Sequence, residues 1–325
     1  MSGPVASRYH VRPPALDDVP AIYHLLARLD VAVIGHPDVT EADVRDGFAE
    51  PGYDPTTDGW LVTDAGGDAV GYAWVTGRGS SADIDADFFA DADADPALPV
   101  YLLGLVEKRA TEMGAALGHA EVGLAKGSYR AAVREAGLLA GAGYAVATTF
   151  SRLSITFDGE AQLAEPPPLP AGVRIAVCGA DDVLRRTVHA VKEQAFVSHF
   201  RAVSRTYDEW LAALDSRSVT DWSQVLVAFL DGEPAGMLLA DDSFVDSDNA
   251  GFVQNVGVLP AARGRGLAKL LLRTAFADMR RRGRSGAQLG VDTNNTTGAL
   301  RLYESLGMRA VLHMDVWSKV LRTAR

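Results

Sequence analysis

The chain has 325 residues, of which 48% are hydrophobic and 22% are charged, and its formal net charge is −11 at pH 7. This length fits two domains of ordinary size, and the composition is that of a globular protein with hydrophobic cores. The acidic balance disfavours a nucleic-acid partner, which would be bound through a surface rich in lysine and arginine; it would instead attract cationic ligands such as amines.

The location of the protein is expected to be the cytoplasm. No apolar run is long enough to span a membrane, and the first residues lack the basic and apolar segments of a signal peptide. The single cysteine, Cys178, cannot form an internal disulfide, which agrees with a reducing compartment.

In chain order, the first half starts with an extended Val11-Arg12 pair and an acidic helix start at Asp17-Asp18. A strand, a glycine turn and a second strand are predicted over 61–75. The stretch 83–95 holds six aspartates but lacks the glycine and glutamate of an EF-hand loop, so we expect a solvated acidic loop. A glycine cap at Gly143 and an alternating strand close this half.

Residues 158–172 contain three consecutive prolines, which favour an extended linker. The linker separates a predicted N-terminal domain, 1–157, from a predicted C-terminal domain, 173–325.

The second half repeats the plan of the first. An extended pair, an acidic helix start and a strand–turn–strand segment recur in the same order. Hairpin glycines of the two halves lie 165 residues apart, and the caps Gly143 and Gly307 lie 164 apart. These matches indicate a tandem duplication.

The strongest chemical signal is Arg263-Gly264-Arg265-Gly266, between a predicted strand over 251–260 and a predicted helix that begins at Leu267. A helix N-terminus presents unpaired N–H groups and a partial positive charge. Glycine allows a phosphate to approach the backbone, and arginine adds charge-assisted hydrogen bonds, so this corner suits a pyrophosphate. The corresponding segment of the first half, 99–104, has no arginine, so the N-terminal copy is degenerate at this point.

Two known phosphate motifs do not fit the corner. A P-loop needs Gly-Lys-Ser/Thr, which is absent, and the third small residue of a dinucleotide fingerprint is replaced by Lys269. Seven scattered histidines show no metal-ligand spacing, so no metal is expected.

The corner resembles the acyl-CoA motif of the GCN5-related N-acetyltransferase (GNAT) superfamily. The matching residues are Val256-Gly-Val258-Leu-Pro260 and Arg263-Gly-Arg-Gly266-Leu-Ala268. A second family motif falls in 290–308, with Gly307-Met308 where the family usually has Gly-Phe. The tandem arrangement with one degenerate half resembles the architecture of mycothiol synthase. This resemblance concerns the architecture and does not imply the mycothiol substrate.

The resemblance implies an α/β (α+β) fold: two tandem acyl-CoA N-acyltransferase domains, each a mixed twisted sheet flanked by helices, with the fourth and fifth strands splayed. Acetyl-CoA would be the acyl donor. The residues that it implies for CoA binding are Val256, Gly257 and Val258 along the pantetheine arm, Arg263, Gly264, Arg265, Gly266, Leu267 and Ala268 at the pyrophosphate, and Asn295 and Ala299 beside the arm.

In this family an amine attacks the thioester directly and the intermediate expels the CoA thiolate. Tyr303 matches the family's general-acid position, and a tyrosine near pKa 10 is a reasonable proton donor; a packing role is the alternative. No base is assigned. Glu193, His199 and Asp292 are candidates for base or substrate binding, and Gln254, which cannot act as a base, is a candidate pocket residue.

The expected function is acetyl-CoA-dependent N-acetylation of a small-molecule primary amine by the second half, with the first half structural or acceptor-shaping. Two alternatives remain: a non-catalytic acyl-CoA-binding regulatory protein, and an aminoacyl or peptidyl transferase of the same fold, which the net acidity disfavours. A monomer or a homodimer is expected.

Overall fold

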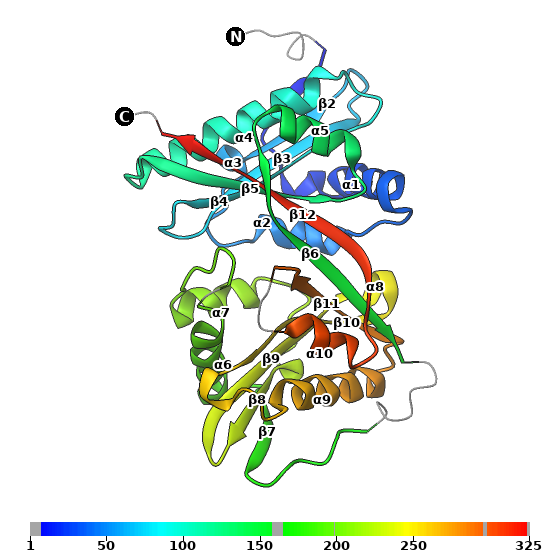
Figure 1. Cartoon of the computed structure of the whole chain (residues 1–325). Helices are drawn as coiled ribbons and strands as arrows, with labels where there is room; N and C mark the ends of the chain where they lie inside the picture. The colour runs from blue at the N-terminus through cyan, green and yellow to red at the C-terminus, as the bar shows by residue number, and fades with distance from the viewer. Residues whose placement is uncertain (1–7, 158–164, 198, 295–297, 324–325) are drawn as a thin grey trace. The chain divides into compact units, whose positions relative to one another are not determined.

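The computed structural model of the chain describes residues 8–157, 165–197, 199–294 and 298–323 (Figure 1). It contains two compact units. Unit 1 consists of Met1–Thr149 and His313–Arg325, and unit 2 consists of Phe150–Leu312. The expected domain limits at 157 and 173 were drawn from the sequence repeat. The limits of the two units are different because each unit includes a strand segment from the other half of the sequence.

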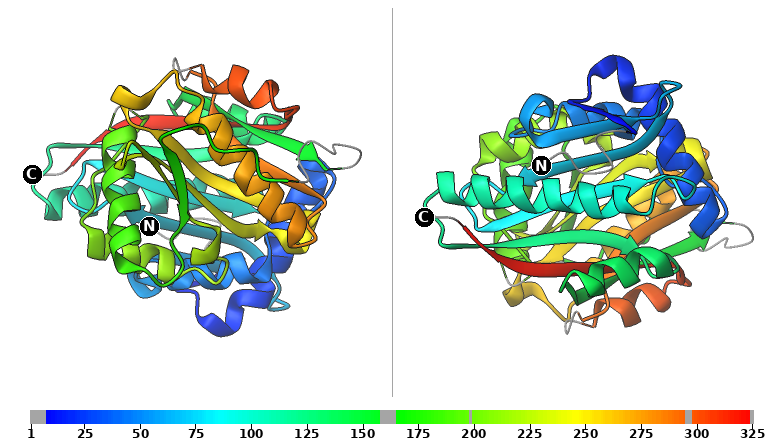
Figure 2. Two further views of the ribbon diagram at one scale, coloured as in Figure 1. Left: turned by 90° about the horizontal axis from the view of Figure 1, so that it is seen from below. Right: turned by 90° about the horizontal axis from the view of Figure 1, so that it is seen from above.

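Unit 1 is a mixed sheet with helices. Its strands are ordered β1-β2-β3-β4-β5-β12, and only the β4–β5 pair is parallel. Helix α4 packs on β3, β4 and β5 (Figure 2, right). The strands are β1 (His10–Arg12), β2 (Gly59–Thr63), β3 (Ala69–Gly77), β4 (Asp83–Ala90), β5 (Glu121–Tyr129) and β12 (Arg309–Arg322), and the helices are α1 (Val19–Ile34), α2 (Glu41–Phe48), α3 (Pro55–Asp58), α4 (Ala97–Ala116) and α5 (Val133–Gly141).

Unit 2 has the same plan. Its strands are ordered β7-β8-β9-β10-β11-β6, and only the β10–β11 pair is parallel. The strands are β7 (Val173–Val177), β8 (Leu226–Leu230), β9 (Glu233–Phe244), β10 (Ala250–Val258), β11 (Gly286–Asp292) and β6 (Ala145–Thr156), and the helices are α6 (Asp182–Ala195), α7 (Tyr207–Asp215), α8 (Val245–Asp248), α9 (Leu267–Arg281) and α10 (Ala299–Glu304).

The last strand of each sheet comes from the other half of the sequence. Residues Phe150–Thr156 of β6 pair with β11 in unit 2, and Met314–Arg322 of β12 pair with β5 in unit 1. Apart from this exchange, the order of strands is identical in the two units. The tandem duplication and the mixed α/β fold are therefore confirmed.

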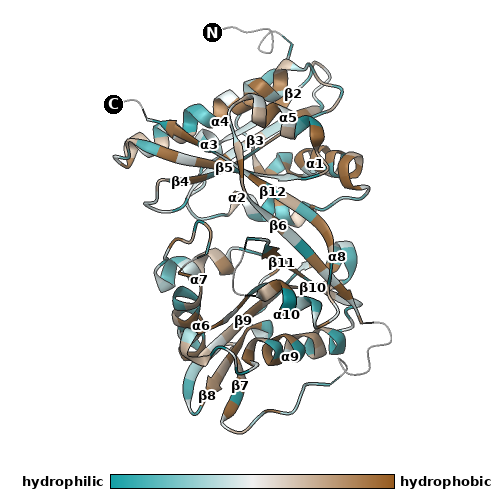
Figure 3. Cartoon of the chain, viewed as in Figure 1, coloured by the Kyte–Doolittle hydropathy of each residue, from teal (hydrophilic) through white to brown (hydrophobic). Residues whose placement is uncertain are grey.

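Both faces of the unit 2 sheet are covered. Met237 and Leu239 of β9 pack with residues of α6 and α7, whereas Leu238 and Ala240 pack with α9. Neighbouring side chains of a strand point to opposite faces, so α6 and α9 lie on opposite sides of the sheet. Helix α9 is amphipathic, and Figure 3 shows teal and brown positions along it.

The prediction of an acidic loop over 83–95 is wrong for residues 83–90, because strand β4 spans Asp83–Ala90. Ile84, Ala86 and Phe88 are buried in the unit 1 core, and the aspartates alternate with them. This period of two is typical of a strand, and the density of aspartates obscured it.

Candidate functional site

Strand β10 bends where the candidate site begins. Its register with β9 shifts between Val253, which faces Ala240, and Asn255, which faces Leu239. Gln254 is thus an extra residue in β10, a β-bulge. Such a bulge interrupts the ladder and bends the strand.

From the bulge onward, β10 and β11 diverge. Their parallel register ends at the pair Val253 and Leu289, although β10 continues to Val258 and β11 to Asp292. The two strands thus have the splay that the GNAT resemblance implies. We call the space between Gln254–Val258 and Gly290–Asp292 the unit 2 cleft.

The strand-to-helix corner follows at the end of β10. Gly264 and Gly266 have φ of 78° and 76°, a left-handed conformation that L side chains rarely adopt. The first backbone hydrogen bond of α9 runs from the N–H of Leu270 to the carbonyl oxygen of Gly266, at 3.0 Å. Among the described residues, no backbone carbonyl accepts from the N–H groups of Gly264 to Lys269. These donors point out of an exposed helix start.

Space and charge at the corner also suit an anion. A Cβ built on Gly264 or Gly266 would meet no atom within 4 Å. Arg263 donates from Nε to Val258 O at 3.1 Å, which holds it against the end of β10, and Arg265 is exposed. Open backbone donors, a helix dipole and two cations make this corner able to bind a diphosphate.

Tyr303 lies on α10, in the core that packs against the cleft. It is 7% exposed and shares one hydrophobic cluster with Val256 and Ala299. Among the described residues, no side chain or backbone group forms a hydrogen bond with its hydroxyl. The hydroxyl oxygen is not completely buried and keeps some exposure. Burial raises the pKa of Tyr303 to about 12, so the hydroxyl keeps its proton at neutral pH.

His199 lies on the other side of β10, in the segment after α6. Its ring packs on Phe196, with ring centroids 4.6 Å apart. Phe196 in turn lies against Gly257, where a Cβ would come within 2.7 Å of the ring. Burial lowers the pKa of His199, and the nearby Asp292 carboxylate opposes that shift. The structure thus brings two of the predicted residues, His199 and Asp292, together near the cleft.

Glu193 is placed differently. Its carboxylate accepts from Lys192 Nζ at 3.1 Å and lies 3.9 Å from His189 Nε2. Burial raises its pKa, but the hydrogen bond from Ser204 and the charge of Lys192 outweigh burial, and the net shift is downward. A carboxylate held ionised in this way is a weak base.

Asn295, the remaining predicted contact of the pantetheine arm, lies outside the described residues. Leu267 is buried and Ala268 half-buried in the first turn of α9.

Comparison with known proteins agrees with this geometry. Residues 188–308 match the family described as Acetyltransferase (GNAT) family. This region of the chain belongs to the GNAT family.

Relatives and solved structures extend the match. The chain is 33% identical over 178 residues to a mycothiol acetyltransferase of Salinispora tropica, covering 51% of this chain and 55% of that protein. A mycothiol acetyltransferase of Thermobispora bispora is 35% identical over 150 residues, covering 43% and 48%. The chain thus spans about half the length of the curated relatives it matches.

Two solved structures cover nearly all of the chain. A GCN5-related N-acetyltransferase from Sphaerobacter thermophilus matches with a TM-score of 0.81 and 25% identity, over 98% of this chain and 97% of that one. A tandem GNAT protein from the clavulanic acid biosynthesis pathway matches with a TM-score of 0.73 and 15% identity, over 98% and 100%. The whole chain therefore has the tandem GNAT fold.

The sequence did not reveal what holds the bulge at Gln254 in β10. Asp241 of β9 is 1% exposed, and Gln254 Nε2 donates to its carboxylate. Arg217 donates to the same carboxylate at 3.3 Å, and Ser243 Oγ at 2.7 Å. Gln254, a predicted pocket residue, is thus tied to β9. Asp241 directly follows the apolar residues Met237 to Ala240 in the sequence, and an acidic residue at the end of such a run was the signal that could have found this cluster.

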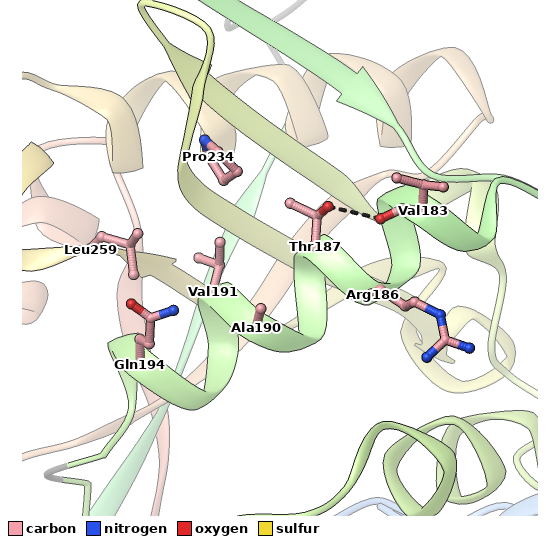
Figure 4. Close-up of a pocket in the computed structure, with 8 residues that line it drawn as sticks. All are labelled: Val183, Arg186, Thr187, Ala190, Val191, Gln194, Pro234 and Leu259. Atoms are coloured by element: carbon pink, nitrogen blue, oxygen red, sulfur yellow. Dashed lines mark hydrogen bonds between the residues drawn. The ribbon is translucent and has the colours of Figure 1, made fainter.

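A pocket of about 440 Å³ lies between α6 and two residues of the sheet, Pro234 in β9 and Leu259 directly after β10 (Figure 4). Arg186, its charged residue, pairs with Asp182 and lies over the Tyr207 ring. None of the predicted GNAT site residues lines it; the lining residues are Val183, Arg186, Thr187, Ala190, Val191, Gln194, Pro234 and Leu259.

Within the described ranges, no group of three or more His, Cys, Asp or Glu side chains is placed to hold a metal ion. Nor does any helix that the structure describes have the length and apolar character needed to cross a membrane.

Proposed function

We propose that the protein is an acetyl-CoA-dependent N-acetyltransferase that acts on a small-molecule primary amine. The observation that carries the proposal is the adjacency of two features on one strand. The cleft opens at the bulge of β10, and the corner of unpaired N–H groups follows at the end of the same strand. A ligand with an extended arm and a diphosphate matches both features.

The corner residues would bind the donor. The N–H groups from Gly264 to Ala268 would hold the diphosphate, and Arg263 and Arg265 would add charge-assisted bonds. The backbone of Val256 to Val258, with Gly257 between them, would pair with the pantetheine arm, and Ala299 would lie beside it. Acetyl-CoA supplies a thioester acyl group when bound.

Tyr303 would act as the general acid. The amine nitrogen forms a bond to the acyl carbon, the carbon–sulfur bond breaks, and the thiolate takes a proton from the Tyr303 hydroxyl. The raised pKa of Tyr303 keeps that proton available at neutral pH.

His199 is the group best placed to accept the proton of the attacking amine. It lies near the cleft through Phe196, and the lowered pKa keeps its ring neutral at pH 7. Asp292, whose charge acts on His199, would orient it or bind the amine. Glu193 would hold neither role, because Lys192 and Ser204 stabilise its ionised form.

Two measurements test the proposal. Isothermal titration is expected to show acetyl-CoA binding to the full chain, and a panel of primary amines is expected to release free CoA thiol. Binding without thiol release from any amine would indicate the non-catalytic acyl-CoA-binding alternative. Absence of binding by the folded chain would refute both functions.

A further inference from the structure

Unit 1 has its own splayed pair of strands. The parallel register of β4 and β5 runs from Asp83 and Gly123 to Asp85 and Ala125. Strand β4 continues to Ala90 and β5 to Tyr129. The two strands therefore diverge directly after Ala125, just as β10 and β11 diverge after Leu289.

The side chain that follows this last pair is Lys126. It is 4% exposed, and its ammonium forms ion pairs with Asp87 of β4 and with Glu135 of α5, the latter at 2.9 Å. Ser128 donates to the second oxygen of Glu135. We call Lys126, Asp87 and Glu135 the lysine cluster.

The ammonium of Lys126 lies in the gap between the strands. Its Nζ is 5.0 Å from the Phe88 ring centre and 5.1 Å from the Phe89 ring centre. These consecutive residues point to opposite faces, since Phe88 packs in the core with α4 and Phe89 in the core with α1. A group within reach of both rings is at the level of the sheet, where the strands are apart.

Unit 2 has glycine at the corresponding place. Gly290 follows the last β10–β11 pair as Lys126 follows the last β4–β5 pair, and the two residues are 164 apart, the spacing of Gly143 and Gly307. Gly290 is exposed, and a Cβ on it would meet no atom within 4 Å.

The other positions of the cleft differ in the same way. At the spacing of 164 residues, Glu135 corresponds to Ala299, and Leu139 corresponds to Tyr303. Leu139 is fully buried in the unit 1 core. Unit 1 thus has a charged residue at a position where unit 2 has a small one, and no hydroxyl at the position of the proposed acid.

We propose that the lysine cluster fills the cleft of unit 1 and excludes acyl-CoA from it, so that each chain binds one acyl-CoA, in unit 2. This inference rests on the proposed function. A pantetheine arm could enter unit 1 only by displacing a buried ammonium. Asp87 and Glu135, both half-buried, would then lose the ammonium that pairs with them, which is unfavourable for carboxylates partly removed from water.

The first test is the stoichiometry of acetyl-CoA binding to the full chain, measured by isothermal titration. One molecule per chain is expected. Two molecules per chain would overturn the inference and leave the proposed function standing, whereas no binding would overturn the proposed function itself.

The second test places the unit 1 lysine in unit 2. Gly290→Lys is expected to weaken acetyl-CoA binding by roughly 100-fold, because the arm would have to displace a side chain from the cleft. The variant should fold, since Gly290 is exposed and has open space before it. Gly104→Lys, on the exposed side of α4 and also without neighbours within 4 Å, is the matched control and should bind as the wild type does.

If Gly290→Lys bound one acetyl-CoA with wild-type affinity, the ligand would lie elsewhere and the inference would be wrong. Thermal unfolding of both variants checks that a loss of binding does not come from a loss of fold.

Discussion

The ring of Phe196 packs directly on the α-carbon of Gly257, so that a methyl group there would come within 2.7 Å of it. Phe196 also packs against His199, with ring centroids 4.6 Å apart. Because Gly257 lies in the splayed segment of β10, this chain of contacts fixes His199 near the cleft. The absence of a side chain at residue 257 is what allows the approach.

His199→Gln is expected to lower kcat/KM by about 100-fold, the range of general acid–base catalysis. Burial lowers the pKa of His199 below its ordinary value of 6.5, with Asp292 opposing the shift. The neutral ring, which is the active form, therefore predominates at pH 7. The wild-type rate should fall only as the pH drops below 6.5, and this acidic limb should be absent in the variant. A pH–rate profile of thiol release measures both effects.

His119→Gln serves as the control for this profile, because His119 belongs to unit 1 and contacts Ser80 O at 2.9 Å. It should retain the wild-type profile. An unchanged acidic limb in His199→Gln would exclude His199 as the base.

Tyr303→Phe is expected to reduce kcat by about 100-fold while acetyl-CoA affinity stays within about twofold. The change removes only the hydroxyl, and the ring continues to pack in the core beside Val256 and Ala299. Single-turnover kinetics and isothermal titration measure the two quantities. Tyr144→Phe, a buried tyrosine of unit 1, is the matched control. If Tyr303→Phe turned over at the wild-type rate, Tyr303 would have only a packing role.

The corner could be predicted from the sequence because its determinants are local. A strand, two glycines and a helix start within a few residues fix the positions of the backbone donors. The positive φ of Gly264 and Gly266 is a direct consequence of that tight connection. The repeat was also visible, because glycine caps such as Gly143 and Gly307 recur at a constant spacing.

Other features depend on contacts that no local pattern encodes. The exchange of β6 and β12 depends on pairing between strands far apart in the sequence, such as Leu153 with Leu289. The bulge at Gln254 is held by Asp241 of the neighbouring strand. Lys126 reads as an ordinary polar residue in the sequence, and only the divergence of β4 and β5 gives it a role.

Asp241→Ala is expected to lower the free energy of unfolding by about 2 kcal/mol, because Gln254 and Ser243 would lose a buried acceptor. The bulge of β10 would lose its tie to β9, so acetyl-CoA affinity should fall as well. Denaturant unfolding measures the first effect. Asp246→Ala, at an exposed aspartate of α8, should change stability by less than about 0.5 kcal/mol. Equal stability of the two variants would show that Asp241 does not hold the bulge.

The two ends of α9 allow a matched test of the corner. Gly266 begins the helix with φ of 76°, and Gly283 follows its end with φ of 80°. Alanine at either position should cost about 1 kcal/mol of stability, because both would force an L residue into the left-handed region. Because the two variants should lose the same amount of stability, any difference between their affinities for acetyl-CoA reports on contact with the ligand and not on the fold.

Only Gly266→Ala is expected to weaken acetyl-CoA binding, by about 10-fold, since its new methyl group would stand beside the N–H groups that face the diphosphate. Gly283→Ala lies at the negative end of the helix dipole, away from those donors, and should bind as the wild type does. Isothermal titration of the two variants, at matched temperature and salt, measures the difference. Equal affinities of the two variants for acetyl-CoA would mean that the diphosphate does not lie on the start of α9. The methyl group at residue 266 would then have no effect on the ligand beyond the backbone strain that both variants share.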